Sequence, residues 1–161
     1  MNARRKNQKG FSLIELLIVV AIILIIAAIA IPNLMRSKIQ ANEAAAVETL
    51  KTLDTSVVMY STTYGGFPHA LADMGPSSGA ATTSAAADLI DSVLATGVKS
   101  GFKYAYAVVS TDPAGNVLSY SITASPVTLG VTGQRSFYTD QSGTIRSTTS
   151  GTADSTSTPI Q

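Results

Sequence analysis

An apolar run from Phe11 to Ile31 constrains this chain more than any other feature of its sequence. Within these 21 residues only Ser12 and Glu15 are polar. A helix of this length is roughly 31 Å long, which is about the thickness of the hydrocarbon layer of a bilayer. The run therefore predicts a helix that can cross a membrane.

The charges around the run indicate how such a helix would be oriented. Four basic residues precede it: Arg4, Arg5, Lys6 and Lys9. An excess of positive charge before a spanning segment predicts a cytoplasmic N-terminus and an exported C-terminal part. Arg36 and Lys38 follow the run and weaken this asymmetry without reversing it.

The formal net charge of +1 conceals a split along the chain. The residues after Gly10 carry seven basic and ten acidic side chains, a balance of −3. This balance gives no indication of a nucleic-acid-binding patch, so no nucleic-acid partner is expected. The sequence contains no cysteine, which excludes disulfides, thiolate chemistry and cysteine-based metal sites.

Two ordinary interpretations of the N-terminal segment are incomplete. A secretory signal peptide would explain the basic start and a cleavage-like Ala28-Ile29-Ala30, but its apolar region usually has about 7–15 residues. A plain membrane anchor explains the orientation but not Glu15. A carboxylate inside the apolar layer costs about 2.5–3.5 kcal/mol unless it reaches water at the interface or finds a partner.

A third interpretation accounts for all of these features. The stretch KGFSLIELLIVVAIILIIAAIAIP, residues 9–32, resembles the class III signal of type IV pilins and the related pseudopilins. The resemblance implies cleavage after Gly10 by a prepilin peptidase and methylation of the new N-terminal Phe11. Glu15 matches the glutamate at the fifth position of the mature family members. Pro32 falls where the family has a proline that bends the helix, and the ten-residue leader resembles the type IVa group.

The resemblance also implies partners and a location. We expect a single-pass inner-membrane precursor with a cytoplasmic N-terminus, and an extracellular pilus fibre after assembly. The expected partners are other copies of the chain in a helical homopolymer, the prepilin peptidase and methyltransferase, and the pilus assembly machinery. Cleavage would create a charged amine at Phe11, which is the candidate partner of Glu15 in assembly.

Beyond Pro32 the pattern becomes that of an amphipathic helix. Apolar residues recur at spacings of three, four and seven, which places them on one helix face: Ile39, Ala46, Leu50, Leu53, Val57, Tyr60 and Tyr64. Gly65-Gly66 and Pro68 predict the end of the helix near residue 64.

The remaining sequence predicts short helical turns at 70–74 and 87–95, followed by two hairpins. Strands are expected at 102–110 and 116–125, and at 135–139 and 144–147, because these segments are rich in β-formers and are joined by turn sequences. The predicted fold class is α+β and pilin-like, with a long N-terminal helix packed on an antiparallel sheet of about four strands.

The resemblance and these patterns together predict four parts of the chain. Residues 1–10 are expected to form a basic leader that is cleaved, and residues 11–32 the membrane and fibre-core half of the helix. Residues 33–147 form a globular domain that includes the second half of the helix to about residue 64. Residues 148–161 are rich in Ser and Thr, which favours a flexible tail.

No catalytic residue, metal site or cofactor is expected. The single histidine, His69, follows Pro68 at the helix exit, and no G-x-S-x-G sequence is present. Asp112 and Asp140 lie in turn sequences, where aspartate is favoured by local backbone bonding. The aromatic residues alternate along the expected strands, which is typical of packing residues.

The leading hypothesis is a structural subunit of a type IV pilus, with adhesion or motility roles implied by the family. A pseudopilin or minor pilin of a type II secretion or DNA-uptake system is the alternative. A membrane-anchored adhesive module and a membrane-tethered enzyme are hypotheses of other classes, and the sequence offers no catalytic constellation for the latter.

Overall fold

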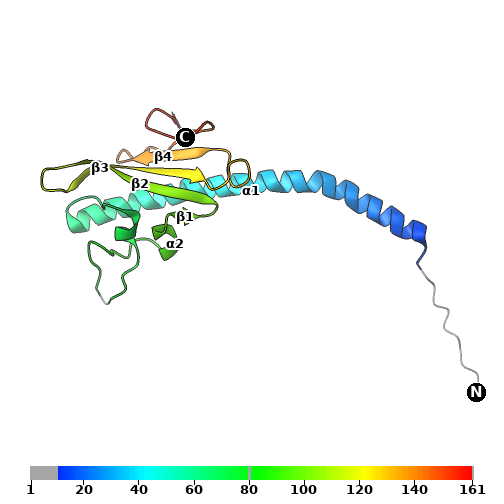
Figure 1. The fold of residues 1–161 in the computed structure, drawn as a ribbon, viewed down its shortest axis with the longest axis horizontal. Coiled ribbons are helices and arrows are strands. Elements are labelled where there is room, and N and C mark those ends of the chain that lie inside the picture. Colours follow the sequence, from blue (N-terminus) through cyan, green and yellow to red (C-terminus); the bar gives the residue numbers. More distant parts are fainter. Residues whose placement is uncertain (1–10, 80, 161) are drawn as a thin grey trace, which may run out of the picture. The chain divides into compact units, whose positions relative to one another are not determined.

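The computed structural model describes residues 11–79 and 81–160 (Figure 1). The expected leader 1–10, including Gly10, lies outside the described residues. Contacts divide the chain into two units on either side of the Ser37–Lys38 bond. Each unit is described by itself.

The first unit, residues 11–37, is the beginning of helix α1, which comprises Leu13–Tyr64. The helix continues through Pro32 without interruption. All side chains of this unit are exposed except that of Ala27, which is partly buried. The bend expected at Pro32 stays a prediction.

The second half of α1 carries the buried face that the residue spacing predicts. Six of the seven expected residues are buried, and Tyr64 is partly buried at the helix end. Three polar residues, Glu43, Thr49 and Ser56, are buried on the same face. The helix ends at Tyr64, where Gly65 adopts a left-handed φ of 81° and donates its N–H to the Ser61 carbonyl at 2.9 Å.

Six strands form one antiparallel sheet, so the expectation of about four strands was too low by two. They are β1 (Val98–Lys99), β2 (Phe102–Thr111), β3 (Val117–Pro126), β4 (Ser136–Asp140), β5 (Arg146–Thr148) and β6 (Thr158–Pro159). Their order in the sheet is their order in the chain. The four expected strands correspond to β2–β5, which confirms the antiparallel α+β fold.

The hydrophobic core lies between the second half of α1 and the sheet (Figure 1). The helix contributes Ala46, Leu50, Leu53, Val57 and Tyr60. The sheet contributes Phe102, Tyr104, Tyr120, Ile122, Ala124 and Phe137. Phe102 and Phe137 contact each other with ring centroids 5.8 Å apart.

The connection from α1 to the sheet contains two short helices. A 3₁₀-helix, η1, comprises Leu71–Met74, and α2 comprises Ser92–Ala95. Met74 and Leu94 from these helices are buried in the core. The helical turn expected at 70–74 is present, whereas the one expected at 87–95 is limited to its last four residues.

The Ser/Thr-rich segment 148–160 makes defined contacts with the sheet. β6 pairs with β5 through Arg146↔Pro159 and Ser147↔Thr158. Ala153 is buried, and Ile160 donates its N–H to the Ile145 carbonyl at 2.9 Å. Composition favours a flexible tail for this segment. In the structure, the strand pairing, the buried Ala153 and the Ile160 hydrogen bond hold it beside the sheet.

Candidate assembly site

The first turn of α1 brings Glu15 against the start of the helix. The Glu15 carboxylate accepts a hydrogen bond from the Ser12 backbone N–H at 2.8 Å. The Ser-x-x-Glu spacing is that of a capping box, in which the glutamate satisfies a backbone donor at the helix terminus. The positive end of the helix dipole also favours a carboxylate at this position. Glu15 therefore has a local structural role that the sequence interpretation did not include.

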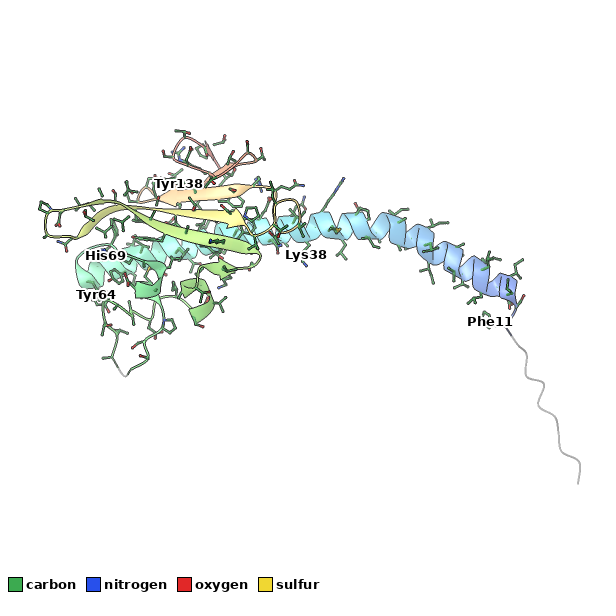
Figure 2. The ribbon with its side chains drawn as sticks, in the orientation of Figure 1. Phe11, Lys38, Tyr64, His69 and Tyr138 are labelled. Atoms are coloured by element: carbon green, nitrogen blue, oxygen red, sulfur yellow. The ribbon has the colours of Figure 1, made fainter. Side chains whose placement is uncertain are left out.

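The same carboxylate keeps capacity for a further partner. An ionised carboxylate has about four acceptor positions, and Ser12 uses one of them. Glu15 is exposed, and Phe11 at the start of the described chain is 80% exposed (Figure 2). Glu15 can thus cap its own helix and still accept a charged amine from another molecule.

The apolar side chains of the first unit form a continuous exposed surface. The described residues contain one helix that is long and apolar enough to cross a membrane, α1. The most apolar stretch of this helix has no buried residue. Aliphatic side chains such as Leu17, Ile22 and Ile29 are more than half exposed. Such a surface is stable only in lipid or against other apolar helices.

The site residues expected from sequence therefore lie along one segment. Phe11, Glu15 and Pro32 belong to the exposed first unit, and Gly10 precedes the described part of the chain. Their roles in cleavage, methylation, assembly and bending remain predictions.

An ion pair between the buried Glu43 and the partly exposed Arg135 in the second unit was not expected from sequence. Glu43 accepts hydrogen bonds from the backbone N–H of Gln134 at 2.8 Å and from that of Arg135 at 3.1 Å. Its second oxygen accepts one from Nε of Arg135 at 2.8 Å. These contacts fasten the connection between β3 and β4 to α1. Glu43 lies four residues after Ile39, so its place on the apolar face could have been noticed.

A second acidic residue of α1, Asp54, also faces the sheet. Its carboxylate accepts hydrogen bonds from the hydroxyl of Thr139 at 2.8 Å and from that of Tyr120 at 3.3 Å. Burial raises the pKa of Asp54 from 3.8 to about 6, although both hydrogen bonds oppose this rise. The nearby carboxylate of Asp140 also contributes to the increase.

The residues considered for catalysis take part in local backbone hydrogen bonds at turns. His69 is exposed, and its backbone N–H donates to Asp73 at 2.9 Å. Asp112 and Asp140 accept backbone hydrogen bonds from Asn116 and Ser142, as expected for turn residues. No cluster of three or more potential metal ligands occurs in residues 11–79 and 81–160.

The aromatic residues of the strands pack in the core as expected. Tyr104, Tyr120 and Phe137 are buried, and Tyr106 stacks on Tyr120 with ring centroids 5.6 Å apart.

Comparisons with known proteins find a family motif in the N-terminal segment. Residues 5–31 match the family model of the prokaryotic N-terminal methylation motif. Over 65 residues the chain is 34% identical to the type II secretion system core protein G of Klebsiella michiganensis, a match that covers 40% of this chain and 46% of that protein.

Type IV pilus proteins match over shorter stretches at higher identity. The chain is 60% identical over 38 residues to the type IV wide pilus major component PilA4 of Thermus thermophilus, covering 24% of this chain and 29% of that protein. It is 50% identical over 50 residues to the type IV major pilin protein PilA of Myxococcus xanthus, covering 31% and 23%. The chain thus aligns with less than half the length of these relatives. Its homologues are type II secretion core proteins G and type IV pilins, which confirms the resemblance drawn from residues 9–32.

Proposed function

We propose that this chain is a type IV pilin, a structural and non-enzymatic subunit that polymerises into a surface fibre. The observation that carries the proposal is the exposed apolar segment 11–31, with the Glu15 carboxylate at its start. The aliphatic side chains of this segment are exposed in the first unit, and a surface of this kind is stable only in lipid or against other apolar helices. The methylation motif and the pilin homologues support the same conclusion.

The proposed pathway begins with the precursor in the inner membrane, its basic leader in the cytoplasm. A prepilin peptidase hydrolyses the Gly10–Phe11 amide bond, and the new amine of Phe11 is methylated. Assembly machinery then transfers the subunit into a fibre. The Phe11–Ile31 helices pack together in its core, and the globular domains cover its outside.

Glu15 has the central role in subunit addition. A methylated amine remains basic, so Phe11 stays positively charged and attracts a carboxylate. Charge-assisted hydrogen bonds of this kind contribute about 1.5–3 kcal/mol when water is excluded. Pairing between Glu15 of one subunit and Phe11 of a neighbour would favour one register of addition.

A pseudopilin of a type II secretion system is the second candidate. The observation that favours it is the length of the match to core protein G, which at 65 residues extends beyond the apolar segment. The higher identity to PilA4 and PilA within the shorter stretches favours the pilin. Both candidates use the same processing and the same helix, and they differ in the length and abundance of the fibre.

Mass spectrometry of sheared surface fibres tests this function. The expected result is an abundant chain that begins at a monomethylated Phe11. Surface fibres that lack this chain, or a chain that keeps Met1, would contradict the pilin proposal. A processed chain found only in the membrane fraction, together with impaired protein secretion after deletion, would favour the pseudopilin.

A further inference from the structure

The connection between β3 and β4 presents three large aliphatic side chains to solvent. We refer to residues 127–132 as the apolar loop. Val127 is 57% exposed, Leu129 is 69% exposed and Val131 is 52% exposed. Three such side chains within five residues are an unusual concentration for a surface turn, where polar residues are favoured.

The apolar loop is held together by its own backbone hydrogen bonds. Thr128 accepts bonds from the N–H groups of Val131 at 3.1 Å and Thr132 at 2.9 Å. Gly130 adopts a φ of 80° and donates to the Gly133 carbonyl at 2.8 Å. The aliphatic side chains are therefore displayed by a defined turn, with the backbone polar groups largely satisfied inside it.

The loop is fastened to the first turns of α1 within the second unit. Nδ2 of Asn42 donates to the Thr132 carbonyl at 3.0 Å. The next helix residue, Glu43, binds Gln134 and Arg135 directly after the loop. The loop thus lies at the end of the globular unit where the chain enters from the apolar segment.

Two lysines lie near the same end of the globular unit. Lys38, labelled in Figure 2, is a residue of α1. It precedes Asn42 by four residues, so helical spacing places the two on the same face. Lys103 pairs in register with Ser125, two residues before the loop. Neither lysine has an ion-pair partner within the part of the chain that the structure describes, whereas Arg135 neutralises Glu43.

We propose that the apolar loop is a membrane-contact element. Val127, Leu129 and Val131 enter the headgroup region of the outer face of the inner membrane, and Lys38 and Lys103 contact anionic lipid headgroups. Aliphatic side chains flanked by basic ones are the combination that binds an anionic bilayer surface. The inference rests on the proposed function, because the anchor must first place the globular unit beside the bilayer.

Charge favours lipid over the apolar segment of a second copy as the occupant. The apolar segment of a neighbouring subunit carries one acidic residue, Glu15, among its 21 residues. An anionic bilayer instead presents many negative headgroups beside an apolar layer, and so complements both the lysines and the aliphatic side chains.

Site-specific fluorescence on the full chain can test this contact, because the sequence has no native cysteine. Leu129→Cys carries a fluorophore at the loop, and Leu118→Cys is the matched control. Leu118 is 57% exposed and lies eight residues from Pro126 along β3, or about 26 Å. Ile22→Cys reports whether the anchor is inserted. Each protein is reconstituted in vesicles of phosphatidylglycerol and phosphatidylethanolamine at low protein density.

The expected result is several-fold stronger quenching at Leu129 than at Leu118 by a spin-labelled lipid, with the reverse order for aqueous iodide. Equal access of iodide to both sites, with Ile22 quenched by lipid, would overturn the inference and leave the anchor intact. Absence of lipid quenching at Ile22 would overturn the proposed membrane anchoring itself. Shielding of Leu129 that disappears on dilution of the protein in lipid would identify a second copy as the occupant.

The basic residues provide an independent measurement. Replacing phosphatidylglycerol by phosphatidylcholine should reduce lipid quenching at Leu129 several-fold, and so should the double change Lys38→Gln and Lys103→Gln. Lys51→Gln is the control, since Lys51 is an exposed lysine more than two turns further along α1. Quenching at Leu129 that is insensitive to headgroup charge would overturn the role of the lysines.

Discussion

Two carboxylates on the side of α1 that faces the sheet have different surroundings. Glu43 is paired with Arg135 and accepts three hydrogen bonds. Asp54 accepts two hydroxyl hydrogen bonds but has no cation beside it in the described structure. Removing one partner of the pair between Glu43 and Arg135 leaves the other charge uncompensated, which lowers stability. Asp54 has no cation beside it, so its ionised form is itself unfavourable in the folded chain.

Removing the Glu43 side chain should destabilise the globular unit. In Glu43→Ala, two backbone N–H groups and the Arg135 guanidinium lose their acceptor. The expected loss is about 2–4 kcal/mol, below that of a fully buried pair because the Arg135 side chain is 43% exposed. Chemical unfolding of the full chain in detergent, followed by circular dichroism, measures it. Glu48→Ala, at an exposed position of the same helix, should change stability by less than about 0.5 kcal/mol.

Asp54 should make stability depend on pH in an unusual direction. Its pKa in the folded chain is about 6, above the value of 3.8 for an unperturbed aspartate. Between these two values the folded state binds more protons than the unfolded state, so the contribution of Asp54 to stability falls as pH rises. Above about pH 6 the stabilising contribution of the protonated Asp54 is lost completely.

Asp54→Asn tests this dependence. The variant should be more stable than the parent at neutral pH, by on the order of 1 kcal/mol after allowance for partial solvent screening. The advantage should shrink as pH falls from about 6 towards 3.8. Thermal unfolding across this pH range provides the measurement. An advantage that stays constant with pH would show that Asp54 is not the titrating group.

At the scale of elements, the close contact between the β3–β4 connection and β2 depends on a glycine. A Cβ added at Gly133 would lie 2.5 Å from Cζ of Phe102 and 3.1 Å from Cβ of Pro126. Phe102 is fully buried and cannot move away without disturbing the core.

Gly133→Ala should therefore cost about 1–3 kcal/mol of stability, as overpacking usually does. Gly79→Ala is the control, because its Cβ would meet no atom within 4 Å. Equal stability of the two variants in chemical unfolding would mean that the Phe102 ring adapts to the added methyl group.

The elements differ in how well the sequence predicts them. The apolar segment and the buried face of α1 follow from residue spacing alone, and β2–β5 follow from alternation and turn residues. β1 and β6 have two residues each, too few for any periodicity to be detected. Glu43 and Asp54 lie on α1, but their donors are more than 60 residues away in the chain. Only the fold brings such groups together.

At the scale of the whole molecule, the charge of Glu15 should matter more for assembly than for the subunit itself. Glu15→Val removes both the helix cap and the charge, whereas Glu15→Gln keeps an acceptor for the Ser12 N–H. If pairing with a neighbouring Phe11 amine drives addition, both variants should be processed and stay in the membrane. In both variants the yield of fibres should fall by a factor of about ten or more.

Shearing followed by quantification of fibres and of processed membrane subunit measures this effect. Ile18→Val, a conservative change in the same exposed segment, should assemble normally. Normal fibre yield from Glu15→Gln together with failure of Glu15→Val would assign the defect to the helix cap instead of the charge.

The sequential order of the six strands has a consequence for folding after export. Each hydrogen-bonded pair joins strands adjacent in the chain, so the loops that must close are local and the entropy of closing them is small. In the proposed topology, residues after the anchor cross the membrane in chain order. Each strand then arrives when its predecessor is already outside, and the sheet can grow at the rate of translocation without waiting for a distant partner.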